Sequence, residues 1–455
     1  MALGQNDGVS QLRSRLTQIA GIVVSFQLIG LAVAYVYSNY FGRATFADAY
    51  LFRSADSSPL ALGATSAPIL GDHHFGDFQW PLSTTKDLGR GGYYGSAQFF
   101  FYVVRDFPAA IGLLVSLALS VVCVLIAVKS LSRELSSAEA FAGTTLLFLV
   151  TQPVLLAFDR GQIHLLMVAM MILGFSLQSP ESSKRERQLG AIFVGVAVSM
   201  KLVPAFFLLF FLRKHHRDRL LPGLCGFVAA LLLPAAFVRS GIGSLLSVVG
   251  LQQFKKNDLT DNLYSSGSYF ENTKAFNHSF KALIGVLHQH TAFVNDFLLL
   301  CFRHYSLVAA ALVVSFSWII VSKKLTDAQS LVVCAILSSR LMPISSGYTL
   351  VVFLIPVFLI LADHVEERQK SNRFCVFICA LTMMPAQVRF GWLPFNPNTY
   401  TYSSLLGPAI SLLFLTVMLL KALLPARCQM GKVSFGARRL SPRAWGSTIS
   451  QRYLN

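Results

Sequence analysis

The chain has 455 residues, of which 54% are hydrophobic and only 13% are charged. Soluble proteins carry about 25% charged residues, so this composition excludes a soluble globular protein. Apolar runs of roughly 20 residues recur along the chain, which is the pattern of a protein with many membrane-spanning helices. We therefore expect an all-α polytopic membrane protein.

The formal net charge of +17 raises the question of a nucleic-acid partner. The basic residues gather in short segments between apolar runs, at 184–187, 213–217 and 323–324, and in the tail from Arg427 onward. Cytoplasmic loops of membrane proteins have this excess of Lys and Arg. Membrane orientation therefore explains the charge, and we expect no nucleic-acid partner.

The apolar runs predict about ten spanning helices. We place them at 17–38, 109–128, 139–157, 161–178, 218–239, 305–322, 327–343, 348–362, 373–389 and 404–423. The first run is interpreted as a retained helix, because it is long for a signal peptide and lacks a clear cleavage site. With the N-terminus in the cytoplasm, the polar segments 39–108 and 240–304 form two large extracytoplasmic loops.

The first of these loops contains GDHHFGDFQW at residues 71–80. The carboxylate of Asp77 lies among aromatic residues at the membrane surface, where it can act as general base on a hydroxyl. A solvated loop acid or a helix cap is the alternative. His73 and His74 have no second ligand pair at zinc spacing, so they are candidate substrate contacts and we expect no metal. The aromatic run 99–102 predicts a helix lying along the bilayer surface.

A short polar turn follows between two predicted spans on the outer side. It contains Arg160, Gln162 and His164, whose donor groups suit phosphate or sugar oxygens. A turn needs polar residues in any case, so a purely structural role is the alternative.

Residues 189–212 are apolar but have basic clusters on both flanks. A single crossing would leave one cluster on the wrong side of the membrane. Two half-length helices that break near Pro204 place both clusters in the cytoplasm. We therefore predict a re-entrant hairpin with Lys201 at its tip, facing a cavity open to the outside. A plain spanning helix is the alternative.

Two later segments add polar groups on the outer side. Asn277, His278 and Ser279 open an apolar stretch of the second loop, where they either cap a helix or contact substrate. Arg340 lies near the outer end of a predicted span, where an ionisable residue is expected to be functional. Snorkelling to the interface is its alternative. With Arg160 and Lys201, Arg340 would form a cationic floor that holds a lipid phosphate.

The chain as a whole divides into two parts. Residues 1–423 form the membrane domain, and the basic tail at 424–455 is expected to be a cytoplasmic anchor on anionic lipid. No phosphate-binding loop, dinucleotide fingerprint or zinc pattern is present in the sequence. We therefore expect no nucleotide or metal cofactor, and an activated co-substrate that brings the energy for the chemistry.

The order of these motifs resembles glycosyltransferase family 87. These are integral-membrane polyprenol-phosphate-sugar transferases of the GT-C fold, and they include bacterial mannosyltransferases. The motifs are Gly-Asp-Phe, Gly-Gly-Tyr-Tyr at 91–94, Arg-Gly-Gln, Lys-Leu-Val-Pro, Asn-His-Ser-Phe and Met-Pro-Ile-Ser-Ser-Gly-Tyr at 342–348. The likeness runs from about residue 17 to 365.

The resemblance implies a GT-C-like bundle and assigns roles to several residues. Asp77 matches the family's catalytic Asp, and Lys201 and Pro204 match its Lys-x-x-Pro. Asn277 and Ser279 match its Asn-Gln-Ser, with His278 in place of Gln. Near residue 346 the family often has Trp followed by His, but this chain has Ser346, Gly347 and Tyr348, so the role of a His there is in doubt.

The implied activity is that of an inverting hexosyltransferase in cell-envelope biosynthesis. A mannose-like sugar moves from polyprenyl phosphate to a glycolipid or glycan acceptor at the outer face of the plasma membrane. The expected donor contacts are Lys201, Arg160, Gln162, Arg340 and His164; the expected acceptor or loop contacts are His73, His74, Asn277, His278, Ser279 and Tyr348. The alternatives are a secondary transporter or lipid flippase, for which we see no internal repeat, and a non-catalytic scaffold.

Overall fold

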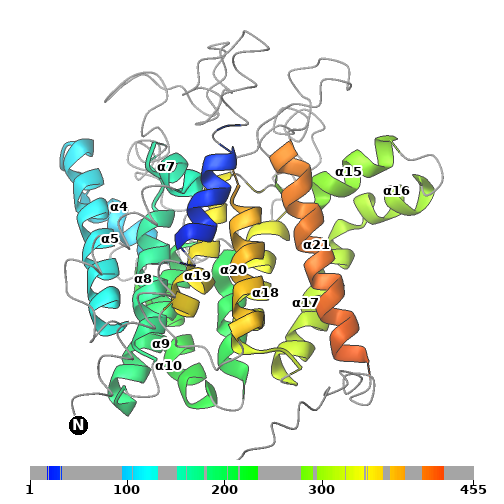
Figure 1. Cartoon of the computed structure of the whole chain (residues 1–455). Helices are drawn as coiled ribbons and strands as arrows, with labels where there is room; N and C mark the ends of the chain where they lie inside the picture. Colours follow the sequence, from blue (N-terminus) through cyan, green and yellow to red (C-terminus); the bar gives the residue numbers. More distant parts are fainter. Residues whose placement is uncertain are drawn as a thin grey trace, which may run out of the picture.

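The protein is a bundle of helices in the computed structural model (Figure 1). The structure describes residues 18, 20–30, 32, 95–104, 106–131, 151–159, 161–178, 182–201, 203–213, 216–233, 278–290, 295–322, 324–342, 345, 347–361, 369–384 and 402–424. Every secondary-structure element in these ranges is a helix. The predicted all-α fold is therefore confirmed for the described part of the chain.

The helices overlap each of the predicted spans. After a first helix at Ala20–Gly30, they are α4 (Gly95–Val104), α5 (Ala109–Leu131), α7 (Gln152–Asp159), α8 (His164–Ser176), α9 (Lys184–Met200), the 3₁₀ helix η1 (Val203–Leu212), α10 (Arg217–Leu232), α15 (Phe280–His290), α16 (Asn295–Arg303), α17 (Tyr305–Val321), α18 (Asp327–Arg340), the 3₁₀ helix η5 (Gly347–Phe353), α19 (Leu354–Leu361), α20 (Gln369–Thr382) and α21 (Tyr402–Leu423).

Fewer of these helices than predicted are long enough to cross a membrane. Among the described residues, Ala110–Ala127 and Leu405–Leu423 satisfy both length and hydropathy. A third span results if α16 and α17, which meet at an angle of 82°, are counted as one. Other apolar helices, such as His164–Ser176, are shorter. The ten-span topology therefore stays a prediction.

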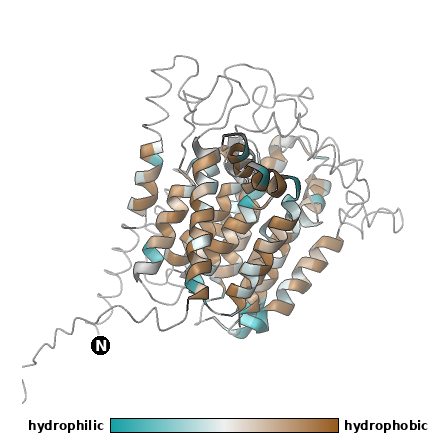
Figure 2. Ribbon diagram, turned by 90° about the vertical axis from the view of Figure 1, so that its right-hand side faces the viewer, coloured by the Kyte–Doolittle hydropathy of each residue, from teal (hydrophilic) through white to brown (hydrophobic). Residues whose placement is uncertain are grey.

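Large apolar side chains cover the outside of the bundle. Leu114 of α5, Leu221 of α10, Val314 of α17 and Leu413 of α21 are between 64% and 69% exposed. Figure 2 shows that hydrophobic residues predominate on helices at the edge of the bundle as well as on those within it. Helices that are apolar on all sides are stable within a protein core or in lipid. This surface therefore indicates a membrane protein.

α18 lies at the centre of the bundle. Every residue from Ala328 to Arg340 is buried, and α18 packs against η1, η5, α19 and α20. Its start is fixed by a capping box, in which the Thr326 hydroxyl accepts from the Gln329 backbone N–H and the Gln329 side chain accepts from the Thr326 backbone N–H. A buried central helix of this kind fixes the positions of the groups at both of its ends.

Glycines allow α8, α9 and α10 to touch through their backbones. A Cβ atom added to Gly195 of α9 would lie 2.0 Å from the carbonyl oxygen of Gly223 of α10. One added to Gly190 would lie 2.4 Å from the carbonyl oxygen of Gly174 of α8. Small residues at the contact permit the close approach on which helix association in membranes depends.

The predicted break before Pro204 is confirmed. α9 ends at Met200, Lys201 has extended backbone with φ −154° and ψ 127°, and η1 begins at Val203. Arg219, which follows η1, donates to the side chain of Gln178, which precedes α9, at 3.2 Å. This contact joins the two segments that flank the predicted hairpin. The second arm is a 3₁₀ helix, and its re-entrance into a membrane stays a prediction.

The predicted outer loops contain helices of their own. α15 and α16 form a packed pair in which the Lys281 ammonium lies 5.0 Å from the centre of the Phe302 ring. α4 packs against α9 and α10, and Phe101 is only 1% exposed. Phe101 is therefore covered by other helices, and the expectation that the aromatic run 99–102 lies along the bilayer surface stays a prediction. Gly95, with φ +46°, allows this packing, because its missing Cβ lets α4 contact the backbone of α10.

Candidate functional site

Three of the predicted site residues lie at one end of the bundle. α18 begins at Asp327, which pairs with Arg213 at 2.8 Å, and ends at Arg340. His164 starts α8 and Lys201 follows α9, each at the end away from Arg213. We call these the Arg340 end and the Arg213 end. In Figure 1 the Arg340 end is uppermost, where α7 and α15 also lie.

The turn between α7 and α8 is closed by a Schellman motif. Gly161 has φ +66°, its N–H donates to the Phe158 carbonyl at 2.9 Å, and the Gln162 N–H donates to the Ala157 carbonyl at 2.8 Å. This left-handed position favours glycine, which has no Cβ to clash with the backbone. The glycine of the Arg-Gly-Gln motif is therefore structural, and it sets the direction of the residue that follows.

Gln162 and His164 form a buried polar pair at this turn. His164 Nδ1 donates to Gln162 Oε1 at 2.9 Å, and the two residues are 2% and 5% exposed, respectively. The bond orients the imidazole and fixes its tautomer. Lys201 is partly exposed and lies close enough to His164 for their charges to interact. The structure thus brings together three of the residues that the sequence assigned to the donor.

The position of Lys201 is set by two helices. Ser199, two residues before it, shares a hydrogen bond of 2.7 Å with the hydroxyl of Ser96 at the start of α4. The Ser96 hydroxyl also donates to the Val196 carbonyl at 3.1 Å. These bonds hold the end of α9 against α4, so the extended Lys201 leaves the helix at a defined point.

Arg340 is completely buried. Its Nη1 donates to the carbonyl of His278 at 2.8 Å, and the guanidinium lies 5.9 Å from the centre of the Phe353 ring. The hydroxyl of Tyr305 donates to the carbonyls of Arg340 and Leu341 at 3.3 and 3.0 Å. The alternative that this side chain snorkels to the interface was wrong, because it points into the bundle.

Arg340 has no acidic partner in the described part of the chain. Its Nε and Nη2 atoms are buried and have no hydrogen-bond partner among the described residues. Removing an ion from water costs several kcal/mol unless a counter-charge and hydrogen bonds replace the lost solvation. A guanidinium in this setting is chemically suited to bind an anion.

His278 and Ser279 lie beside Arg340. The His278 backbone N–H donates to the Ser345 carbonyl at 2.7 Å, and the Ser345 hydroxyl shares a 2.9 Å bond with that of Thr349. The Ser279 hydroxyl accepts from the Ala282 N–H at 3.1 Å, which is a helix-cap contact at the start of α15. Of the two roles that the sequence left open for Ser279, the structure therefore shows the cap.

η5 connects the two groups of polar residues. This 3₁₀ helix packs against α7, α8 and α18, so it lies between the turn that carries Gln162 and His164 and the helix that ends at Arg340. Tyr348 lies in η5 by its backbone. The predicted site residues Asp77, His73, His74, Arg160 and Asn277 lie outside the described residues.

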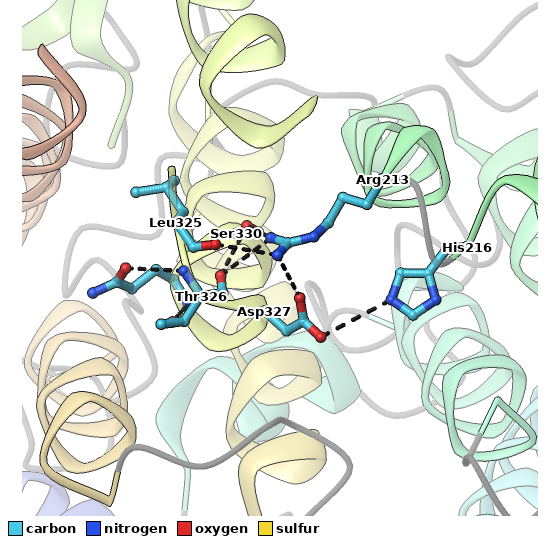
Figure 3. Close-up of polar contacts among 7 residues, drawn as sticks. Arg213, His216, Leu325, Thr326, Asp327 and Ser330 are labelled. Atoms are coloured by element: carbon cyan, nitrogen blue, oxygen red, sulfur yellow. Dashed lines mark hydrogen bonds and ion pairs between the residues drawn. The ribbon is translucent and has the colours of Figure 1, made fainter. Parts of the chain in front are cut away.

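Sequence reasoning missed a second polar cluster, at the Arg213 end (Figure 3). Arg213 donates to Ser330 Oγ at 2.5 Å and to the Leu325 carbonyl at 3.1 Å, besides its ion pair with Asp327. His216 stacks on Phe210, with ring centres 4.6 Å apart, and its Nε2 lies 4.0 Å from Asp327 Oδ2. From the sequence, Arg213 was interpreted only as part of a basic cluster that indicates membrane orientation. The capping pattern Thr326–Gln329 was the one local sign that a helix begins beside it.

A model of glycosyltransferase family 87 matches residues 96–346, which is more than half of the chain. The chain belongs to glycosyltransferase family 87. No curated protein and no solved structure was found to match it. Membership of family 87, together with the apolar helices, makes the chain a membrane glycosyltransferase. It gives no support to the transporter or flippase alternative.

The residues matched to family 87 include most of the polar groups described above. Gln162, His164, Lys201 and Arg340 all lie within 96–346. Asp77, the predicted base, precedes this range, and Tyr348 follows it. These four of the expected donor contacts thus belong to the part of the chain that carries the family likeness.

Proposed function

We propose that this family 87 member transfers a hexose, mannose-like or related, from a polyprenyl-phosphate donor to a lipid or polysaccharide acceptor. The reaction would take place on the extracytoplasmic face of the plasma membrane, with both termini in the cytoplasm. The observation that carries the proposal is Arg340, a buried guanidinium with two nitrogens that have no hydrogen-bond partner among the described residues. A lipid-linked phosphate supplies the missing charge.

The other proposed donor contacts lie at the Arg340 end of the bundle. Lys201 is the second cation and remains partly exposed, so it is suited to meet the phosphate as it arrives. Gln162 and His164, tied to each other at 2.9 Å, are suited to hydrogen-bond the sugar hydroxyls. Arg340 has no exposed surface, so a phosphate reaches its guanidinium only after neighbouring segments move apart.

The proposed chemistry is a single displacement. Asp77 takes the proton of the acceptor hydroxyl, and the acceptor oxygen forms a bond to the anomeric carbon. The bond from that carbon to the phosphate oxygen breaks, and its electron pair leaves with polyprenyl phosphate. The anomeric configuration inverts because attack and departure occur on opposite faces. Cations beside the phosphate bind the donor and hold it in line for the displacement.

The direct test uses the purified full-length chain in lipid vesicles, with radiolabelled hexosyl polyprenyl phosphate and a glycolipid acceptor. We expect labelled acceptor and release of polyprenyl phosphate. Transfer from a nucleotide sugar in the absence of the lipid donor, or no transfer from any lipid-linked hexose, would contradict the proposal.

Two variants test the assigned roles. Asp77→Asn removes the base and is expected to lower kcat by about 100-fold or more. Arg340→Gln removes the buried cation and is expected to raise the KM for the donor, because a hydrogen bond to a charged group is lost. Arg303→Gln is the matched control, because Arg303 is exposed at the end of α16. A variant that keeps wild-type kinetics would remove its residue from the mechanism.

A further inference from the structure

The two nitrogens of Arg340 without hydrogen-bond partners lie on the same edge of the guanidinium. Nη1 is used by the His278 carbonyl, whereas Nε and Nη2 have no hydrogen-bond partner in the described part of the chain. In a planar guanidinium, Nε and Nη2 present two parallel N–H groups whose spacing matches two oxygens of a phosphate. The edge left over by the protein is thus the edge that binds an oxyanion with two hydrogen bonds.

Gly407 of α21 borders this edge. A Cβ atom added at position 407 would lie 2.8 Å from Nη2 and 3.5 Å from Cζ of Arg340. A Cβ atom does not approach a non-bonded nitrogen so closely, so any side chain at 407 would displace the guanidinium. Because Arg340 has no exposed surface, its side chain has no solvent-filled space into which it can turn. The position of the Nε–Nη2 edge therefore depends on the absence of a side chain at 407.

The two halves of α21 are anchored differently. Its second half belongs to the main hydrophobic core, for example through Phe414. Its start packs through Leu405 on a separate small cluster with Ala282 and Val286 of α15. Pro408 lies between the halves, and its missing N–H removes one helical hydrogen bond there. The segment over Arg340 is therefore anchored on a different element from the rest of α21, with Pro408 between the two.

We infer that Gly407 is a positioning residue of the donor-phosphate site, and that α21 forms the wall against which Arg340 presents its Nε–Nη2 edge. This inference rests on the proposed function, since it takes the phosphate of the lipid-linked sugar as the ligand. Gly407 lies outside the residues matched to the family, 96–346. Its place beside Arg340 is therefore known from the tertiary structure and not from the family match.

The first test is Gly407→Ala. We expect the KM for hexosyl polyprenyl phosphate to rise about tenfold, as for the loss of a hydrogen bond to a charged group, with kcat little changed. Gly21→Ala is the matched control, because a Cβ at position 21 meets nothing within 4 Å. A wild-type KM in Gly407→Ala, with an active wild-type enzyme, would overturn the inference and leave the proposed function standing.

The second test places Gly407→Ala in an Arg340→Lys background. Lysine has no Nη2 atom, so the added methyl group has nothing to displace, and the double variant should match Arg340→Lys in both KM and melting temperature. An equal further rise in KM, or an equal drop in melting temperature, in both backgrounds would show that position 407 acts independently of Arg340. That result would also overturn the inference, whether or not Gly407→Ala folds less well by itself.

A binding measurement separates this inference from the proposed function. Polyprenyl phosphate should raise the melting temperature of the detergent-solubilised wild type, and the rise should be much smaller in Gly407→Ala. Inorganic phosphate at the same concentration should give little shift; an equal shift would identify a site for free phosphate and overturn the lipid assignment. If wild type neither binds polyprenyl phosphate nor transfers sugar from it, the proposed function and the inference both fail.

Discussion

Arg213 and Asp327 form an ion pair in which Nη2 and Oδ1 lie 2.8 Å apart, and it joins the end of η1 to the start of α18. The two side chains are 8% and 17% exposed, so both charges are largely removed from water. The pair is 114 positions apart in sequence, and the Arg213 end is assembled around it (Figure 3).

Asp327→Asn is expected to lower the free energy of unfolding by about 3 kcal/mol, because it leaves the Arg213 guanidinium buried without its counter-charge. Thermal unfolding of the detergent-solubilised protein measures the change. Asp296→Asn, in an exposed position of α16, should leave the melting temperature unchanged. Equal effects of the two substitutions would show that the ion pair does not stabilise this end.

His216 should make stability depend on pH below about 6.5. Burial lowers the pKa of His216 from its ordinary value of 6.5, and the neighbouring Asp327 carboxylate partly offsets this effect. Below pH 6.5 the unfolded chain therefore binds the proton more readily than the folded protein. The free energy of unfolding falls from there down to the folded-state pKa and levels off beneath it, while above pH 6.5 His216 contributes no pH dependence.

His216→Phe tests this linkage, because a phenyl ring can stack on Phe210 as the imidazole does but does not titrate. Melting temperatures of both proteins between pH 5 and pH 8 give the comparison. The wild type should lose more stability than the variant on the acid side. Parallel curves would rule out His216 as the titrating group.

Gly195→Ala is expected to lower the free energy of unfolding by about 2 kcal/mol, because the new methyl group forces α9 away from α10. Helix propensity alone predicts the opposite sign, since Ala is better than Gly in a helix by about 1 kcal/mol. Chemical or thermal unfolding decides between them. Gly21→Ala, with open space around its Cβ, should show the propensity gain alone.

Ser279→Ala is expected to lower the free energy of unfolding by about 1 kcal/mol, through loss of the cap contact with the Ala282 N–H. Sugar transfer by the folded variant should remain near the wild-type rate, because the hydroxyl is occupied within the protein. Unfolding and transfer are measured on the same preparation. A large loss of kcat without loss of stability would instead place Ser279 in contact with substrate.

Local signals in the sequence predicted the features that depend on near neighbours. The break at Lys201 follows from Pro204, which cannot donate a helical hydrogen bond. The helices follow from apolar runs, and the family was recognised from the order of short motifs. The burial of individual side chains could not be predicted in this way. Arg340 is interior and Phe101 is in the core, because packing partners far away in sequence determine which face of a helix is covered.

The sequence by itself determined that this chain is helical, apolar and a member of family 87, because composition, periodicity and motif order are properties of the chain alone. Only the tertiary structure decided that Arg340 faces Gly407 across 67 positions and that Arg213 meets Asp327. Such pairs depend on how closely helices approach, and that distance is set by glycines and buried side chains on several helices at once.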